Sequence, residues 1–317
     1  MAYFLWGLTG VLFLCGQNVQ AAVAMAMKNC LYVLVPVIFP SLVLCLCLVR
    51  VTGKPPKLLL QFFRFLGLPD GAVLPFLLGM FGGYCTGAKL IQTMWDKGKL
   101  SKKQASMALS FCVNPGYGFV AGVLKSDGKW VYLFLLLSSL LVGTMACRKE
   151  SVVFEEEATQ NIEIVFKDAL GEGISAMLGV IASVLLFSAV SACIPNNMPL
   201  MGLDVTSELL KLCEKLPLAA FLLAFGGLSI FLQVRVLCPF ASKHFIFGMF
   251  IKGMMAIGFV FFAQKKGAAM AATFGVALLC VITAVKQRAV LWKSRHYNRT
   301  KYGRAYHSMQ DMFRLQK

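Results

Sequence analysis

The stretch "GGYCTGAKLIQ", residues 82–92, places polar side chains directly after two glycines inside an apolar run. Adjacent glycines favour a helix break, because glycine costs a helix about 1 kcal/mol relative to alanine. If a helix resumes near Thr86, its free N–H groups and positive dipole end face the break, where an anion would bind. Lys89 adds a positive charge on the Thr86 face. The candidate ligand-binding residues here are Gly82, Gly83, Tyr84, Thr86, Gly87 and Lys89.

A second interpretation needs no ligand at this stretch. Lys89 can extend its ammonium to the cytoplasmic interface, and the glycines can simply let neighbouring helices pack closely. Both interpretations stay open at the level of the sequence.

A second polar break occurs in "FCVNPGYGF", residues 111–119, in the middle of an uncharged run. Proline after Asn114 interrupts the helix and leaves carbonyl groups and a carboxamide without helical partners. Such groups cost several kcal/mol each in a membrane if they stay unpaired, so protein, water or a ligand must satisfy them. Asn114 and Gly116 are therefore candidate site residues.

The second half of the chain contains a similar stretch, "AFGGLSIFLQV", residues 224–234. It repeats the order Phe-Gly-Gly, a polar residue and a later glutamine. Ser229 and Gln233 are four residues apart, so they share one face of a helix. The candidates from this stretch are Gly226, Gly227, Ser229 and Gln233.

Lys252 is a possible intramembrane charge, because it lies inside the apolar run 244–264. A lysine within a span is a candidate functional residue that must be paired or face a cavity. The alternative is that its side chain extends to the interface.

The composition indicates which elements position these residues. The 317 residues are 58% hydrophobic and only 14% charged, with a mean hydropathy of +0.74, which is too apolar for a soluble domain. Continuous apolar runs, rather than alternating ones, exclude an outer-membrane barrel. We expect an all-α polytopic integral membrane protein with about eight or nine hydrophobic segments. The clearest runs are 29–49, 105–124, 130–147, 173–203, 216–234 and 267–285.

The order of these segments suggests an internal duplication. We expect a first membrane repeat at 1–147 that contains a hairpin at 71–95, and a second at 168–285 that contains a Gly-Gly segment at 216–238. Between them lies a polar linker, 148–167, and a basic tail follows at 286–317. Paired broken helices in two repeats are typical of the central site of a transporter.

The charged loops constrain the topology. Residues 50–70 and 96–103 are basic, so both should be cytoplasmic. The segment 71–95 between them would then enter and leave on one side, as a re-entrant hairpin. Applying the same pattern to the second repeat would place the basic tail outside, against the positive-inside rule. The conflict disappears if one Gly-Gly segment crosses fully, and the sequence does not say which.

The net charge of +17 resides mainly in short loops and the tail, which favours contact with a membrane rather than nucleic acid. We expect the tail to bind anionic lipid headgroups. The spans contain no paired acids, no Ser/His or Cys/His set and no metal-ligand spacing. We therefore expect no enzyme activity, no cofactor and no metal.

The stretch "GGYCTGAKLIQTMWDKGKLSKKQASMALSFCVNPGYGFVAGV", with "IFPSLVLCLCL" before it and "FGGLSIFLQV" after it, resembles a known family. It is similar to the sporulation integral membrane proteins with nucleoside-recognition (Gate) domains, found in endospore-forming bacteria. The resemblance covers residues 31 to about 285. The family pattern is Gly-Tyr-Pro-x-Gly-Ala-Lys, whereas Cys85 replaces the proline here, and "NPGYGF" replaces an Asn near a Ser-Gly-Pro break.

The resemblance implies a permease-like protein of the bacterial cytoplasmic membrane, or of a forespore membrane. Such a protein would move a small polar solute, anionic and dipicolinate-like or else nucleoside-like, during spore formation. The cationic hairpin favours an anion. The alternative is a membrane scaffold of the sporulation machinery that transports nothing, with the polar breaks serving helix packing.

Overall fold

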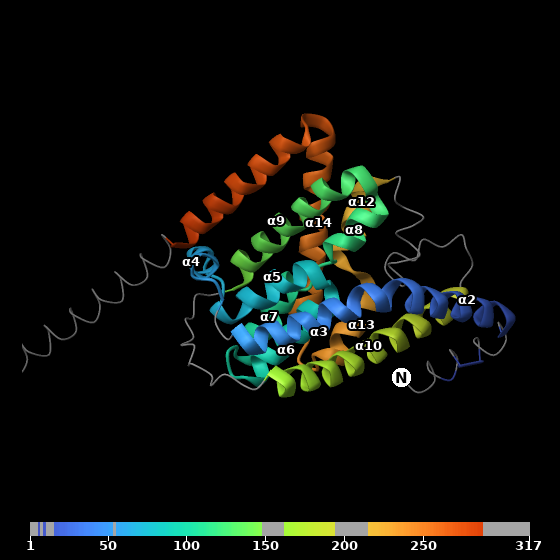
Figure 1. Cartoon of the computed structure of the whole chain (residues 1–317). Coiled ribbons are helices and arrows are strands. Elements are labelled where there is room, and N and C mark those ends of the chain that lie inside the picture. The colour runs from blue at the N-terminus through green and yellow to red at the C-terminus, as the bar shows by residue number, and fades with distance from the viewer. Residues whose placement is uncertain are drawn as a thin grey trace, which may run out of the picture.

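The computed structural model shows a fold in which every regular element is a helix, over residues 6, 9–10, 16–52, 55–147, 162–193 and 215–287 (Figure 1). Five helical stretches are long and apolar enough to cross a bilayer, and a bent pair of helices would supply a sixth crossing. The expectation of an all-α protein with the helices of an integral membrane protein is thus confirmed. Eight or nine segments and an internal repeat stay predictions.

The bent pair forms the N-terminal part of the bundle. α2 (Gly16–Asn29) passes through a π-helix at Cys30–Leu34 into α3 (Val35–Thr52), with a bend of 48° between the two parts. Pro40 lies inside α3 and removes a helical hydrogen bond there, because proline has no backbone N–H.

α10 (Ile162–Ala192) packs along both α2 and α3. Its bounds differ from the sequence prediction, since residues 162–167 of the expected polar linker are already helical. Val165 and Ala169, four residues apart, bury one face of this first part. The remainder of the linker, 148–161, lies outside the described residues.

The first Gly-Gly segment folds back on itself. α5 (Val73–Gly82) and α6 (Tyr84–Asp96) meet at Gly83, and a β-carbon added at Gly79 would lie 3.1 Å from the Cα of Gly87. At the other end, a β-carbon added at Gly71 would lie 2.5 Å from the Lys99 carbonyl oxygen. Both ends of the segment therefore lie on one side, which is the geometry that the basic loops predict for residues 71–95.

The predicted helix break at Asn114 is also present, but the chain does not fold back there as it does at Gly83. α7 (Lys102–Cys112) ends before it and α8 (Tyr117–Leu124) begins after it. After a 3-10 turn, α9 (Gly128–Ala146) runs back along both helices, because Tyr132 contacts Tyr117 near one end and Ser139 bonds Asn114 further along. The predicted run 105–124 is thus two helices rather than one.

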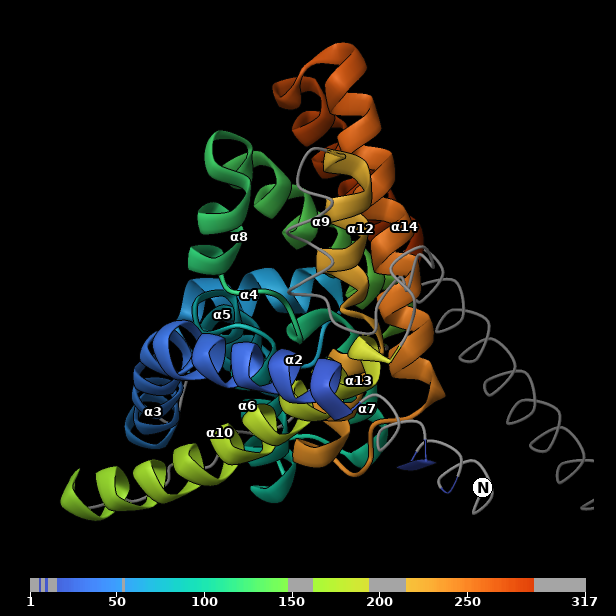
Figure 2. The same ribbon diagram turned by 90° about the vertical axis from the view of Figure 1, so that its right-hand side faces the viewer.

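The second Gly-Gly segment does not fold back. α12 (Leu216–Phe225) and α13 (Gly227–Leu237) together form one candidate span, and Figure 2 shows α13 below α12 beside α14 (Lys243–Lys266). A last helix, Ala268–Gln287, returns along α14. The two segments that look alike in sequence thus differ in path, with the first reversing and the second crossing.

This difference removes the topological conflict seen in the sequence. Lys286, at the end of the last helix, donates to the carbonyl groups of Thr144 and Cys147, and Gln287 donates to the Phe65 carbonyl at 3.1 Å. Figure 1 shows this end of the chain beside α4 (Lys57–Leu66). The start of the basic tail therefore lies on the same side of the bundle as the basic loop 50–70. The rest of the tail lies outside the described residues.

Candidate functional site

Two helix breaks lie against each other in the middle of the bundle. Gly83 separates α5 from α6, and a β-carbon added there would lie 3.3 Å from the backbone nitrogen of Gly116 in the α7–α8 break. Gly83 has φ 86° and ψ −170°, a conformation that only glycine adopts without strain. A β-carbon added at Gly116 would lie 3.0 Å from the Phe81 carbonyl oxygen. Both glycines are therefore needed for this close approach.

Lys252 of α14 binds at the second of these breaks, the one between α7 and α8. Its ammonium nitrogen Nζ lies 2.7 Å from the carbonyl oxygen of Val113 and 3.1 Å from Oδ1 of Asn114, and the lysine is completely buried. The side chain therefore does not extend to an interface but is paired inside the bundle, and its functional role stays a prediction. We call the set Gly83, Val113, Asn114, Gly116 and Lys252 the break junction.

Asn114 organises the break junction. Its amide nitrogen donates to the Phe111 carbonyl at 2.7 Å, and its amide oxygen accepts from both Ser139 of α9, at 2.6 Å, and Lys252. Asn114 has no exposed surface. The polar groups released by the proline break are therefore paired with side chains from two other helices, as the cost of leaving them unpaired requires.

The charge of Lys252 has no partner of opposite sign among the described residues. The ion pairs of Arg50, Arg64 and Lys89 do not include Lys252, whose contacts are the two oxygens named above. An ammonium buried beside neutral oxygens keeps a large desolvation cost, which a carboxylate or another anion would offset. Charges of this kind inside a membrane are rare and mark sites for solutes, ions or protons.

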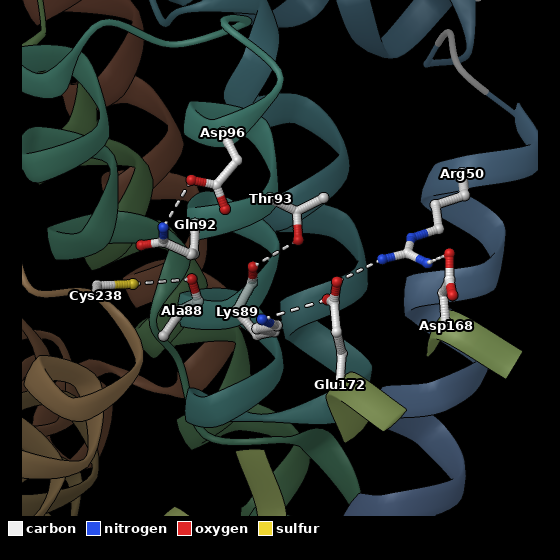
Figure 3. Close-up of polar contacts among 9 residues, drawn as sticks. All are labelled: Arg50, Ala88, Lys89, Gln92, Thr93, Asp96, Asp168, Glu172 and Cys238. Carbon is white, nitrogen blue, oxygen red and sulfur yellow. Dashed lines mark hydrogen bonds and ion pairs between the residues drawn. The ribbon is translucent and has the colours of Figure 1, made fainter. Parts of the chain in front are cut away.

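Lys89 belongs to a separate charged group (Figure 3). Its ammonium lies 3.3 Å from Glu172 of α10, and the same carboxylate accepts from Arg50 of α3 at 2.6 Å. Arg50 also lies 3.6 Å from Asp168. Thr86, predicted to share a face with Lys89, instead donates to the Gly82 carbonyl at 2.9 Å. The Lys89 charge is therefore paired within the protein and does not face the break.

The second Gly-Gly segment packs against the first through polar contacts. The Tyr84 hydroxyl donates to the Leu223 carbonyl at 2.7 Å, just before the break at Gly226 and Gly227. The Cys85 thiol donates to the side-chain oxygen of Gln233 at 3.7 Å. Ser229 and Gln233 are both buried. The two segments are thus neighbours, as expected for elements of one site.

The predicted site residues fall into three groups. Gly83, Asn114, Gly116 and Lys252 belong to the break junction. Beside it lie Gly82, Thr86, which donates to the Gly82 carbonyl, and Gly87, which packs against the Cys112 carbonyl. Tyr84 and Gln233 take part in the contact between the two Gly-Gly segments, and Gly226, Gly227 and Ser229 lie in the second of these segments. Lys89 lies apart in the ion pair with Glu172.

The sequence analysis missed Ser139 and Glu172. Ser139 lies in a Ser-Ser pair within an apolar span, which is a weak signal of a buried polar contact. Glu172 is an acid four residues after Asp168, so both lie on the face of α10 that meets Arg50.

Two hollows in the described part of the chain stand out, and the residues of the break junction do not line them. One, of about 250 Å³, lies between the α12–α13 break and α14, lined by Phe225, Gly227, Leu228, Phe231, Phe245, Ile246 and Met249. The other, of about 470 Å³, is a surface hollow on α4. Both linings are mainly apolar. Because Asn114 and Lys252 have no exposed surface, their polar groups in the break junction are closed to solvent in this conformation, although Gly116 is partly exposed.

These features define a membrane-embedded helical protein with a buried cation at the meeting point of broken helices. Comparisons with family models, with curated proteins and with solved structures found no match to this chain.

Proposed function

We propose that this chain is a permease-like transporter that moves a small polar metabolite, anionic and dipicolinate-like or else nucleoside-like, across a bacterial cytoplasmic or forespore membrane during spore formation. The observation that carries the proposal is the buried Lys252 side chain, which when protonated has no counter-charge among the described residues and is hydrogen-bonded at the α7–α8 break, against which the Gly83 break packs. Broken helices at mid-bundle are where transporters bind their solutes. A bound anion supplies the negative counter-charge that the protonated Lys252 does not find among the described residues.

The arrangement of charge supports an orientation for this transporter. The basic loops 50–70 and 96–103 and the start of the tail lie on one side of the bundle. By the positive-inside rule this side faces the cytoplasm. The closed break junction then corresponds to an occluded state, which opens when helices separate at Gly83 and Gly116.

Uptake of labelled pyridine-2,6-dicarboxylate into proteoliposomes tests the proposal. We expect uptake by the wild type and a loss of about tenfold or more for Lys252→Met, because removing a charge contact of about 1.4 kcal/mol has that effect. Lys129→Met is the matched control, since Lys129 is exposed at the first turn of α9. Uptake equal to that of empty liposomes, for this anion and for labelled nucleosides, would contradict transport.

The same assay examines Lys89. Lys89→Ala removes a cation that is already paired with Glu172. Uptake at the wild-type level would show that Lys89 is not part of the solute site. A loss of uptake as large as that of Lys252→Met would show that Lys89 is part of it.

One observation favours a second function, a membrane scaffold that transports nothing. A β-carbon added at Gly87 would lie 2.3 Å from the Cys112 carbonyl oxygen, so the glycines also serve close backbone packing. A scaffold predicts that Lys252→Met, if present at wild-type levels in the membrane, still supports spore formation. A transporter predicts that it does not.

A further inference from the structure

The hydrogen bonds of Lys252 leave one proton position of its ammonium unused. An ammonium has three N–H donors, and the Lys252 side chain has two acceptors in the described part of the chain, the Val113 carbonyl and the Asn114 amide oxygen. A neutral amine has two N–H donors and one lone pair. Both bonds can therefore persist when the third proton leaves, and the geometry of the break junction suits both protonation states.

The two states differ in what they require from their surroundings. The neutral amine can stay buried between two oxygens at little electrostatic cost. The ammonium needs a nearby negative charge, because its desolvation is otherwise uncompensated. An anion at the break junction thus favours the protonated lysine, and the protonated lysine favours the anion. Binding of the two is coupled, and the coupling is reciprocal.

The neighbouring groups supply no alternative counter-charge. α12 has no titratable side chain, and the Cys112 thiol, next to Val113, is directed to the Ala72 carbonyl at 3.7 Å. The Tyr132 hydroxyl of α9 donates to the Met80 carbonyl, and Lys286 bonds carbonyl groups at the far end of α9. The other titratable side chains on the helices packed against α14 are Lys102, Lys103, Lys129, Arg235 and Cys280, and α14 itself carries Lys243, His244, Lys265 and Lys266. None of these is an acid.

We propose that Lys252 takes up a proton with each transported anion, so that the chain is a proton–anion symporter. This inference rests on the proposed function. On entry of the anion, the amine lone pair of Lys252 accepts a proton from water, and the third N–H donates to the anion. On release, the anion leaves, the same proton returns to water on the other side, and the neutral amine keeps its bonds to Val113 and Asn114. No other bond forms or breaks.

Proton uptake on anion binding tests this inference directly. Pyridine-2,6-dicarboxylate is added to purified protein in a weakly buffered solution that contains a pH-sensitive dye, and bound anion is measured in parallel. For the wild type we expect uptake of about one proton per bound anion at neutral to alkaline pH. The dissociation constant should rise about tenfold per pH unit where the free lysine has lost its proton. Lys129→Met should behave like the wild type.

Substitution by arginine separates charge from proton transfer. Arginine keeps the positive charge but does not release its proton, so Lys252→Arg should bind the anion without proton uptake and without the pH dependence. If this variant folds poorly, the measurement of proton uptake by the wild type still tests whether anion and proton binding are coupled. Anion binding and transport without proton uptake would overturn the coupling and leave the transporter standing. Absence of both binding and transport would overturn the two proposals together.

Discussion

The two Gly-Gly segments share the sequence Phe-Gly-Gly but follow different paths. In the first, Gly83 adopts φ 86° and ψ −170°, and the chain reverses into the α5–α6 hairpin. In the second, Gly226 adopts φ 72° and ψ −15°, Gly227 also has a positive φ, and α13 continues the span begun by α12. The first segment thus breaks at the second glycine of its pair, whereas both glycines of the second segment leave the right-handed helical region.

The neighbours of each break explain the two outcomes. The hairpin closes because Gly79 and Gly87 allow both of its helices to approach the Cys112 carbonyl. The stretch after Gly227 has no glycine corresponding to Gly87, and its Ser229 and Gln233 are buried along a helix that continues. A pair of glycines thus permits a break, and the small residues on either side of it determine whether the helices can pack against each other.

The largest effect should follow from Gly87→Ala, which fills the seam of the hairpin. The added β-carbon would lie 2.3 Å from a backbone oxygen, which a rotamer change cannot relieve. We expect the free energy of unfolding to fall by about 3 kcal/mol, measured by thermal or denaturant unfolding in detergent.

Gly122→Ala is the matched control for this seam. Gly122 lies in α8, and a β-carbon added there meets nothing within 4 Å. This change should be neutral or slightly stabilising, because alanine favours a helix more than glycine does. Equal effects of the two substitutions would contradict the view that backbone contact closes the hairpin.

Substitutions at Gly83 and Gly226 should have a smaller effect on stability, and this effect should reveal the different backbone conformations of the two breaks. Gly83→Ala and Gly226→Ala should each lower stability by about 2 kcal/mol, because alanine is strained at both conformations. Asparagine tolerates the left-handed helical region of Gly226, so Gly226→Asn should cost about 1 kcal/mol less than Gly226→Ala. At Gly83 the ψ of −170° admits only glycine, and asparagine should give no recovery. Recovery at both positions, or at neither, would mean that the breaks do not differ as described.

Much of the fold could be predicted from local features of the sequence. Length and hydropathy predict the spans, and the glycine and proline breaks at 82–83, 114–116 and 226–227 all appear as helix ends. The choice between reversal and crossing could not be predicted for both segments. It depends on which distant backbone each glycine meets, as Gly87 meets Cys112, and periodicity within one segment does not contain that information.

The site was predictable as a set of residue types but not as an arrangement. Asn114 and Lys252 were each identified because polar groups inside an apolar run must be paired. Their mutual contact, across 138 positions of sequence, depends on how α14 packs against α7 and α9. Lys89 was associated with the break because it lies three residues after Thr86, yet Glu172 of α10 pairs with its charge.

The smallest expected effect concerns the charges that hold the hairpin to α10. Glu172 lies between Lys89 of α6 and Arg50 of α3, whereas α13, the corresponding helix of the crossing segment, contacts α6 through the neutral pair of Cys85 and Gln233. Glu172→Gln should lower the free energy of unfolding by about 1 kcal/mol, since all three side chains are partly exposed. Asp168→Asn should cost less than about 0.5 kcal/mol, because Asp168 is more exposed and lies 3.6 Å from Arg50.

Salt should separate this charged contact from the neutral one. Raising the ionic strength screens the attraction between Glu172 and the two cations, so the difference in stability between wild type and Glu172→Gln should shrink. The cost of Gln233→Leu, which removes the acceptor of the Cys85 thiol, should not change with salt, because neither partner is charged. A cost of Glu172→Gln that is independent of salt would mean that the carboxylate acts through packing, and that both segments are held to their neighbours by the same kind of contact.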